Sequence, residues 1–234
     1  MSAIKDDRGF NQIFEQSDGN LIRLKRRAEW MIEQMGEAAN KKILEIGCGT
    51  GYVAYQVALQ TKMQVLGSDL CEPFIEEARE KYKLPNLLFE VLDFNKAADS
   101  VHNKFDYLIG NGILHHLYYN LDDVFKTFSS ILNPGGKIIF MEPNIYNPYV
   151  AAIFKNKLLR KVASLEPDEM AFSGNFIQKK LEKAKFKNIK TVYKDFLLPG
   201  VPRLLIKPSI AIGNILEKTP LKFISQSILI CAEI

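Results

Sequence analysis

Three glycines stand close together between Ile43 and Tyr52, in the stretch ILEIGCGTGY. Gly47, Gly49 and Gly51 follow a short apolar run typical of a buried strand, and helical spacing begins directly after them. Glycines between a strand and a helix let the backbone turn sharply and pass close to a ligand. The pattern indicates a ligand-binding turn, and a tight turn without a ligand is the alternative.

The spacing and charge of this turn argue against a nucleotide that binds through a pyrophosphate. The glycines are spaced G-x-G-x-G, whereas dinucleotide-binding turns have G-x-G-x-x-G. The acidic residue Glu45 precedes them, and a carboxylate there repels a pyrophosphate but attracts a cation.

Acidic residues also end the next two apolar runs. Asp69 lies 18 residues after Gly51, and Asp93 is followed by Phe94. In an open α/β sheet the carboxyl ends of the strands face the ligand crevice. Asp69 can accept hydrogen bonds from a ribose diol, Asp93 can accept from an exocyclic amine, and Phe94 can cover an adenine face. Each acid could instead be a helix cap or a turn former.

Candidates for acid–base catalysis follow the apolar runs at 105–109 and 137–141, the fourth and fifth of the strands predicted below. His116, in the pair His115-His116, can take a proton near pH 7, and Glu142 can hydrogen-bond an acceptor or its neighbours. The alternative is that His116 hydrogen-bonds the backbone and shapes the pocket. No metal site is expected, because the three histidines show no ligand spacing.

Strands and helices alternate along the first 142 residues, and this order positions the residues named above. Apolar runs predict strands at 42–46, 63–69, 87–92, 105–109 and 137–141. Three- and four-residue spacing predicts helices at 20–39, at 51–60, from 72 onward and at 120–132. Such alternation is typical of a doubly wound α/β fold with a mostly parallel sheet.

The last third of the sequence is less regular. Residues 143–172 contain several asparagines and prolines and are interpreted as a loop-rich insertion. A helix is predicted at 173–184, and strands at 188–196 and 227–232. Residues 197–224 hold four prolines and one short amphipathic helix at 209–218. Their apolar content predicts burial against the same chain, another subunit or a lipid surface, with packing over the site as the default.

Five motifs in order, at the expected spacing, carry a family resemblance. The sequence of residues 41–142 resembles the class I S-adenosylmethionine-dependent methyltransferases through the motifs ILEIGCGTGY, VLGSDL, VLDF, FDYLIGNGILHHL and LNPGGKIIFMEP. The resemblance implies a Rossmann-like, seven-stranded sheet whose last strand is antiparallel. The length of 234 residues and the absence of a long linker predict one domain, with a helical cap at 1–40, a cofactor-binding core at 41–142 and acceptor-side segments at 143–234.

The resemblance also implies roles for individual residues toward S-adenosylmethionine. Gly47, Cys48 and Gly49 would contact its methionine part, and Asn111 would lie near the same end. Asp69 and Leu70 would bind ribose and adenine, Asp93 and Phe94 would bind adenine, and Glu45 and Gly51 complete the expected cofactor site. The family commonly has Ala-Gly-Phe where this sequence has Ala184-Lys185-Phe186, so a helix-ending glycine is missing.

The charge of the chain is unevenly distributed. The net charge is +4, but residues 151–234 hold 15 Lys and Arg against 7 Asp and Glu. Such a region can face an anionic substrate, a membrane surface or nucleic acid, or it can be a solvated face. The N-terminus lacks a signal-peptide layout, no apolar run reaches the length of a membrane span, and the three cysteines are scattered, so a cytoplasmic protein is expected.

The leading hypothesis is methyl transfer from S-adenosylmethionine, by in-line displacement, to a small-molecule, glycan-linked or lipid-linked acceptor. A non-catalytic S-adenosylmethionine-binding regulatory or scaffold subunit is the alternative, and a nicotinamide-dependent oxidoreductase disagrees with the glycine spacing. The sequence argues against a nucleic-acid acceptor, because it lacks the N/D-P-P-Y/F tetrapeptide and a Pro-Cys nucleophile. The sequence is compatible with peripheral contact with a membrane, and a monomer or homodimer is expected.

Overall fold

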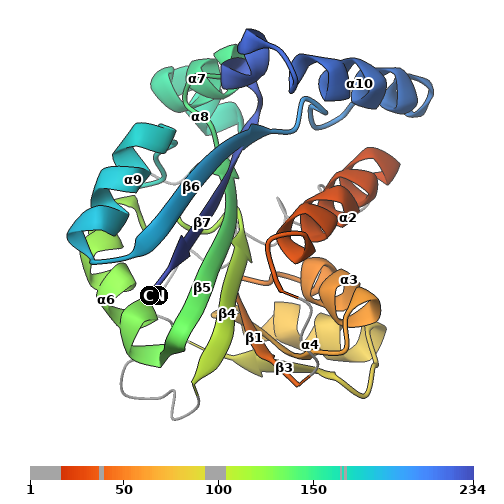
Figure 1. Cartoon of the computed structure of the whole chain (residues 1–234). Helices are drawn as coiled ribbons and strands as arrows, with labels where there is room; N and C mark the ends of the chain where they lie inside the picture. The colour runs from red at the N-terminus through yellow and green to blue at the C-terminus, as the bar shows by residue number, and fades with distance from the viewer. Residues whose placement is uncertain (1–16, 37–39, 93–103, 164, 166–167) are drawn as a thin grey trace.

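The computed structural model describes residues 17–36, 40–92, 104–163, 165 and 168–234. Its centre is a seven-stranded sheet (Figure 1). The strands in spatial order are β3 (Leu87–Val91), β2 (Gln64–Asp69), β1 (Lys42–Ile46), β4 (Phe105–Asn111), β5 (Leu132–Pro143), β7 (Ser227–Glu233) and β6 (Lys187–Lys194). Only β7 runs antiparallel to its neighbours, β5 and β6. The fold predicted from the sequence is therefore confirmed.

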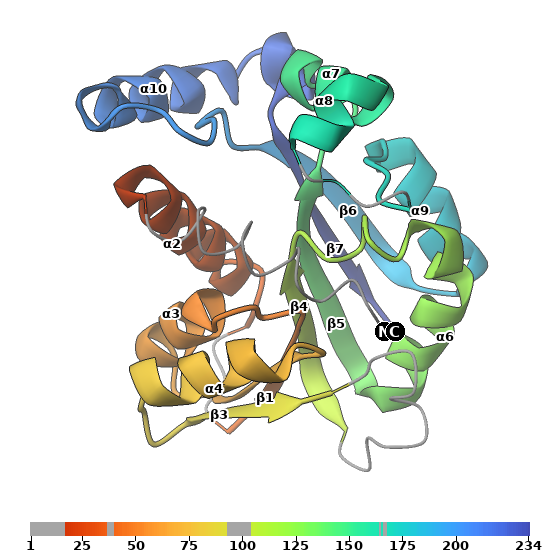
Figure 2. The same ribbon diagram turned by 180° about the vertical axis from the view of Figure 1, so that it is seen from behind.

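Helices cover both faces of the sheet (Figures 1 and 2). One face carries α2 (Asp18–Ile32), α3 (Tyr52–Gln60) and α4 (Glu72–Lys81). The other carries α6 (Leu121–Ile131), preceded by the 3₁₀ turn η2 (Tyr118–Asn120), and α9 (Gly174–Lys183). The two layers follow from strand alternation, because successive side chains of a strand point to opposite faces. In β5, Ile139 and Met141 join the first layer, while Ile138 and Phe140 join the second.

Two regions contain more helix than the sequence predicted. The segment 143–172, interpreted as loop-rich, contains α7 (Pro148–Lys155) and α8 (Lys157–Val162). The side chain of Asn147 accepts from Val150 N–H, and that of Asn156 accepts from the N–H groups of Leu158 and Leu159. Those asparagines, and the proline after Asn147, are helix-start signals rather than loop signals.

The helix predicted at 209–218 is also longer and begins earlier. It is α10 (Arg203–Leu216), and Pro208 lies inside it. Proline removes one backbone donor and usually interrupts a helix. Here the unpaired carbonyl lies in the first turn of α10, where Leu204 is 90% exposed and water can replace the missing donor. A short 3₁₀ segment, η3 (Pro220–Ile224), follows before β7.

The missing glycine after α9 leaves a lysine in the left-handed region, since Lys185 has a φ of 67°. The helix nevertheless ends in a Schellman motif, in which Lys185 N–H donates to the Glu182 carbonyl and Phe186 N–H donates to that of Leu181. A side chain in this conformation is strained, and glycine is not.

We therefore expect Lys185→Gly to raise the free energy of unfolding by about 1 kcal/mol. Urea denaturation monitored by circular dichroism measures this change. The matched control is Lys179→Gly, at an exposed position inside α9, which should lower the free energy of unfolding by about 1 kcal/mol. A Lys185→Gly protein no more stable than the wild type would contradict the assignment of strain.

Candidate active site

The glycine turn lies between β1 and α3, at the carboxyl edge of the sheet. Gly47, Gly49 and Gly51 have φ values of 66°, 53° and 85°, which side chains rarely adopt. Packing excludes side chains as well, since a Cβ on Gly47 would lie 2.6 Å from Cδ1 of Ile113. The turn therefore packs directly against the loop that follows β4.

Asp69, at the end of β2, holds this turn in place. Its Oδ2 accepts from Gly49 N–H at 2.8 Å, and its Oδ1 accepts from Cys71 N–H at 2.9 Å. Burial raises the pKa of Asp69, and the backbone N–H groups of Cys71, Gly49 and Leu70 partly oppose that rise. Each carboxylate oxygen has a second lone pair, so Asp69 can also accept from a diol. Leu70 next to it is 43% exposed.

Two further residues at the turn bear on whether it fits a cofactor. The Glu45 side chain is buried in β1, one strand position before the turn. The Thr50 hydroxyl is also buried and makes no hydrogen bond within the part of the chain that the structure describes. A buried polar atom without a partner is costly unless a ligand or water satisfies it. The turn is therefore suited to a polar ligand.

Asn111, at the end of β4, is bound to the first described helix. Its Oδ1 accepts from Nη1 of Arg27 in α2 at 2.8 Å. Burial, opposed by a nearby carboxylate, lowers the pKa of Arg27 to about 10, so the guanidinium remains charged at neutral pH. Asn111 therefore faces a buried cation as well as the neighbouring strand ends.

That carboxylate is Asp195, which follows β6. Its Oδ2 accepts from Nη2 of Arg27 and Nε of Arg23, both at 2.9 Å, and its Oδ1 accepts from Leu197 N–H. Burial opposes ionisation, but Arg27 and Arg23 lower the pKa of Asp195 below its usual range. We call Arg23, Arg27 and Asp195 the arginine–aspartate cluster. Sequence analysis did not identify it, although the two arginines lie four residues apart in the helix.

Glu142, at the end of β5, is fully buried and bound to the loop after β4. Its Oε1 accepts from the N–H groups of Ile113 and Leu114 at 2.9 and 2.8 Å. Its Oε2 lies 2.9 Å from Nδ1 of His115. Through these contacts Glu142 fixes the backbone that carries both histidines.

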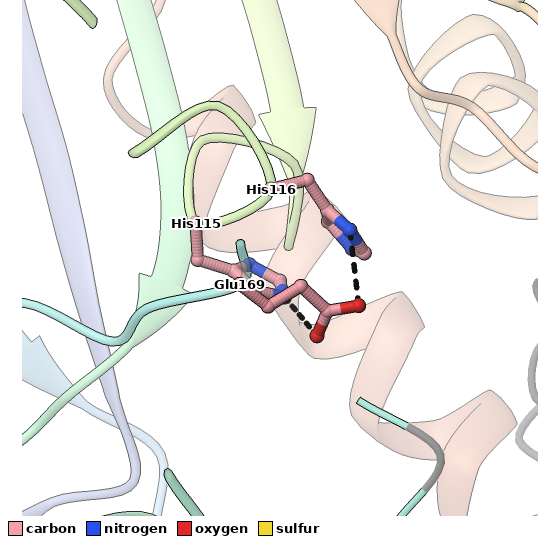
Figure 3. A group of neighbouring side chains, drawn as sticks. All are labelled: His115, His116 and Glu169. Atoms are coloured by element: carbon pink, nitrogen blue, oxygen red, sulfur yellow. Dashed lines mark ion pairs between the residues drawn. The ribbon is translucent and has the colours of Figure 1, made fainter. Parts of the chain in front are cut away.

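His116 and His115 meet a third side chain that sequence analysis did not single out, Glu169 (Figure 3). Nδ1 of His116 lies 3.2 Å from Oε1 of Glu169, and Nε2 of His115 lies 3.8 Å from Oε2. Glu169 is placed by its neighbour Met170, whose N–H donates to the His115 carbonyl. The donor atoms of the three side chains lie within 4.8 Å of one another, which is close enough to share a metal ion.

The environment of His116 favours a neutral imidazole. Burial and the neighbouring His115 lower the pKa of His116 to about 2. When Nδ1–H donates to Glu169, the lone pair stays on Nε2, the atom that could accept a proton. The side chain of His116 is 32% exposed, so a small molecule can reach it.

The structure thus brings together nearly all of the residues expected at the site. Glu45, Gly47, Cys48, Gly49 and Gly51 lie on β1 and its turn, Asp69 and Leu70 end β2, Asn111 ends β4, and Glu142 ends β5. His116 lies on the loop that packs against Gly47. Asp93 and Phe94 fall outside the described residues.

The chain belongs to the family whose model is described as a methyltransferase domain, which matches residues 37–190. This confirms the resemblance: the chain is a class I methyltransferase domain, and S-adenosylmethionine is the cofactor of its class.

Comparisons with individual proteins agree with the family. A highly reducing polyketide synthase from Gibberella zeae is 30% identical over 166 residues, which cover 66% of this chain and 6% of that protein. A ubiquinone biosynthesis O-methyltransferase from Acinetobacter baylyi is 26% identical over 121 residues, or 50% of each protein. A SAM-dependent methyltransferase from Archaeoglobus fulgidus shares the fold, with a TM-score of 0.67, 18% identity and coverage of 96% of this chain and 98% of that one.

Proposed function

We propose that the protein transfers a methyl group from S-adenosylmethionine to a small-molecule acceptor, glycan- and lipid-linked molecules included, by in-line displacement. The packing of Ile113 against Gly47 is the observation that carries this proposal, because it joins the glycine turn to the loop of His116. The relatives described as a polyketide synthase and a ubiquinone biosynthesis enzyme support a small organic acceptor.

When bound, the cofactor supplies an electrophilic methyl group, so the protein mainly binds, orients and excludes water. Asp69 would accept from the ribose hydroxyls, and Leu70 would lie against the adenine. The glycine turn, with Cys48 and Asn111, would contact the methionine end, and Glu45 would favour its positive charge. The described contacts of Asp69 leave the lone pairs that this role needs.

His116 is the residue we propose to remove the acceptor proton, at Nε2. Burial lowers the pKa of its imidazole, so the scheme requires the Glu169 carboxylate beside Nδ1 to stabilise the imidazolium that forms. Glu169 would orient the ring by accepting from Nδ1, which is 3.2 Å from its Oε1. Glu142 is a positioning residue in this scheme, because its contacts are with the loop of residues 113–115. A base is needed only for an acceptor that is protonated at neutral pH, and otherwise His116 would only shape the pocket.

Calorimetry with S-adenosylmethionine is the primary test of the proposal. Binding is expected well below 1 mM cofactor, since KM values are typically between about 1 μM and 1 mM. Transfer of a labelled methyl group into a fractionated small-molecule or lipid extract, with release of S-adenosylhomocysteine, then distinguishes an enzyme from a non-catalytic binding subunit. Absence of binding would refute the proposal, and binding without any transfer would favour the binding subunit.

His116→Gln is expected to lower the transfer rate by about 10²–10⁴-fold, because an acceptor would lose its base. Cofactor affinity should stay within a few-fold. Tyr119→Phe, at a nearby side chain that is 68% exposed, is the matched control and should keep the wild-type rate.

The same assay, run with a chelator, separates a base from a metal ion held by His115, His116 and Glu169. If His116 acts as a base, adding the chelator should leave the transfer rate unchanged. If the chelator abolishes activity and zinc restores it, the three side chains hold a metal ion instead. If the His116→Gln protein has an unchanged transfer rate, His116 is not the base and only shapes the pocket.

A further inference from the structure

Two segments form one surface beyond the carboxyl end of the sheet, the end at which the residues of the candidate site lie. They are residues 145–162, which include α7 and α8, and residues 203–224, which include α10 and η3. Figures 1 and 2 show α7, α8 and α10 together beyond one end of the sheet. That end is the carboxyl end of β5, because β5 leads directly into α7. We call these residues the rim surface.

Exposed apolar side chains are concentrated on the rim surface. It holds 11 of the 19 large apolar side chains that are exposed in the described part of the chain, although it has only 40 of the 201 described residues. The most exposed are Leu204 at 90%, Val162 at 82% and Leu158 at 76%. The others are Tyr146, Tyr149, Leu159, Leu205, Ile212, Ile215, Leu221 and Phe223. Apolar surface gathered in this way typically marks an interaction site.

The rim surface is also strongly basic. It carries eight basic residues, Lys155, Lys157, Arg160, Lys161, Arg203, Lys207, Lys218 and Lys222. Of these, Arg160 donates to the carbonyls of Phe154 and Glu169, and Arg203 pairs with Asp18 of α2, so the six lysines are its main basic groups. Its one acidic residue, Glu217, accepts from Nζ of Lys194 and from Asp195 N–H, and so is used within the protein. Apolar side chains interspersed with lysine and arginine are the pattern of elements that lie in the interface of an anionic membrane.

Hydrogen bonds and buried contacts hold the two segments in place. The side chains of Asn144 and Asn147 donate to the carbonyls of Phe223 and Ile224, which joins η3 to the start of α7. In α10, Ile206 is buried and Gly213 lies against Phe196. The remaining apolar side chains therefore face outward from a fixed support.

We propose that the rim surface docks on anionic lipid bilayers and so holds the mouth of the site at the membrane interface. Among the helices of the described residues, none has both the length and the apolar character needed to cross a bilayer. Pairing of two copies through this surface would bring two basic faces together, which disfavours self-association. Docking requires no methyl transfer, so it can be tested independently of the proposed function.

Flotation of the full chain with lipid vesicles tests the docking proposal. The protein should float with vesicles of phosphatidylcholine and phosphatidylserine, should bind vesicles of phosphatidylcholine alone far more weakly, and should be released by salt. Failure to bind the anionic vesicles would overturn the proposal, as would equal binding to both vesicles at every salt concentration.

Two sets of substitutions assign the binding to the rim surface. Leu204→Ser with Leu205→Ser, which leaves the buried Ile206 in place, should weaken vesicle binding at least tenfold. Lys207→Glu with Lys222→Glu should do the same. The matched control is Leu59→Ser with Leu88→Ser, at side chains that are 53% and 67% exposed outside the rim surface. S-adenosylmethionine affinity and thermal unfolding report that each variant is folded.

Results for these variants can also contradict the proposal. Equal loss of binding in the Leu59 and Leu88 control would show that the effect does not depend on the rim surface. A concentration-dependent dimer in sedimentation that the Leu204 and Leu205 variant abolishes, together with unchanged vesicle binding, would assign the surface to a second copy of the chain instead.

Discussion

Asp195→Ala is expected to lower the free energy of unfolding by about 3–5 kcal/mol, a large part of the roughly 5–15 kcal/mol that stabilises a typical protein. The substitution leaves Arg27 and Arg23 without their shared carboxylate, and Arg27 is buried. An uncompensated buried charge costs far more than the loss of an exposed ion pair. The arginine–aspartate cluster therefore carries the largest stability effect that we expect from a single substitution.

Urea denaturation of Asp195→Ala and of Asp123→Ala measures this difference. Asp123 pairs with Lys126 at 2.7 Å, but its side chain is 81% exposed, so its replacement should change stability by less than about 1 kcal/mol. Comparable stability losses in the two variants would contradict the assigned importance of the cluster.

The pH dependence gives a second readout. Because the folded pKa of Asp195 is lowered, its contribution is present above the unfolded value of about 3.9 and is lost as the pH falls through the lower folded value. Asp195→Asn should remove this part of the acid dependence.

Asp69→Ala is expected to weaken S-adenosylmethionine binding by roughly 10- to 100-fold. Loss of a charge-assisted hydrogen bond to the ribose costs about 1.5–3 kcal/mol, and every 1.4 kcal/mol is tenfold in affinity. The substitution also removes the acceptor for Gly49 N–H, so the turn itself loses its support. Both effects act in the same direction on the cofactor.

Calorimetry on folded Asp69→Ala, with Glu90→Ala as a control at an exposed position of β3, checks this expectation. Asp69→Asn should fall between the wild type and Asp69→Ala, because the amide oxygen can still accept from Gly49 N–H but carries no charge. Unchanged affinity in Asp69→Ala would remove this residue from the cofactor site.

The parts of the fold and site that the sequence predicted depend on neighbouring residues in the chain. Gly47 to Gly51 and Asp69 lie at the ends of strands that their own apolar runs define, and the alternation of strands and helices then orders those ends along one edge. Lys185 is a further example of a local signal. The sequence Ala184-Lys185-Phe186 alone shows that the usual glycine is missing, and the structure adds that Lys185 has a positive φ, which strains the backbone.

The parts that the sequence did not predict depend on contacts between distant segments. Arg27 meets Asp195 and Ser227, and His116 meets Glu169, although no periodicity joins the members of either group. Asn147-Pro148 at the start of α7 and Asn156 at the start of α8 are compatible with either a loop or a helix start, and only the hydrogen bonds of the two asparagines decide between them.

The position of β7 determines when the sheet can be completed while the chain is being synthesised. β7 is the last of the seven strands to leave the ribosome, yet it lies in the interior of the sheet, with β5 on one side and β6 on the other. Until residues 227–233 emerge, β5 presents an open edge and β6 has no partner in the sheet. An open edge of this kind is a template for pairing with another chain. A nascent chain stalled before Ser227 therefore exposes the surface that its final strand will cover.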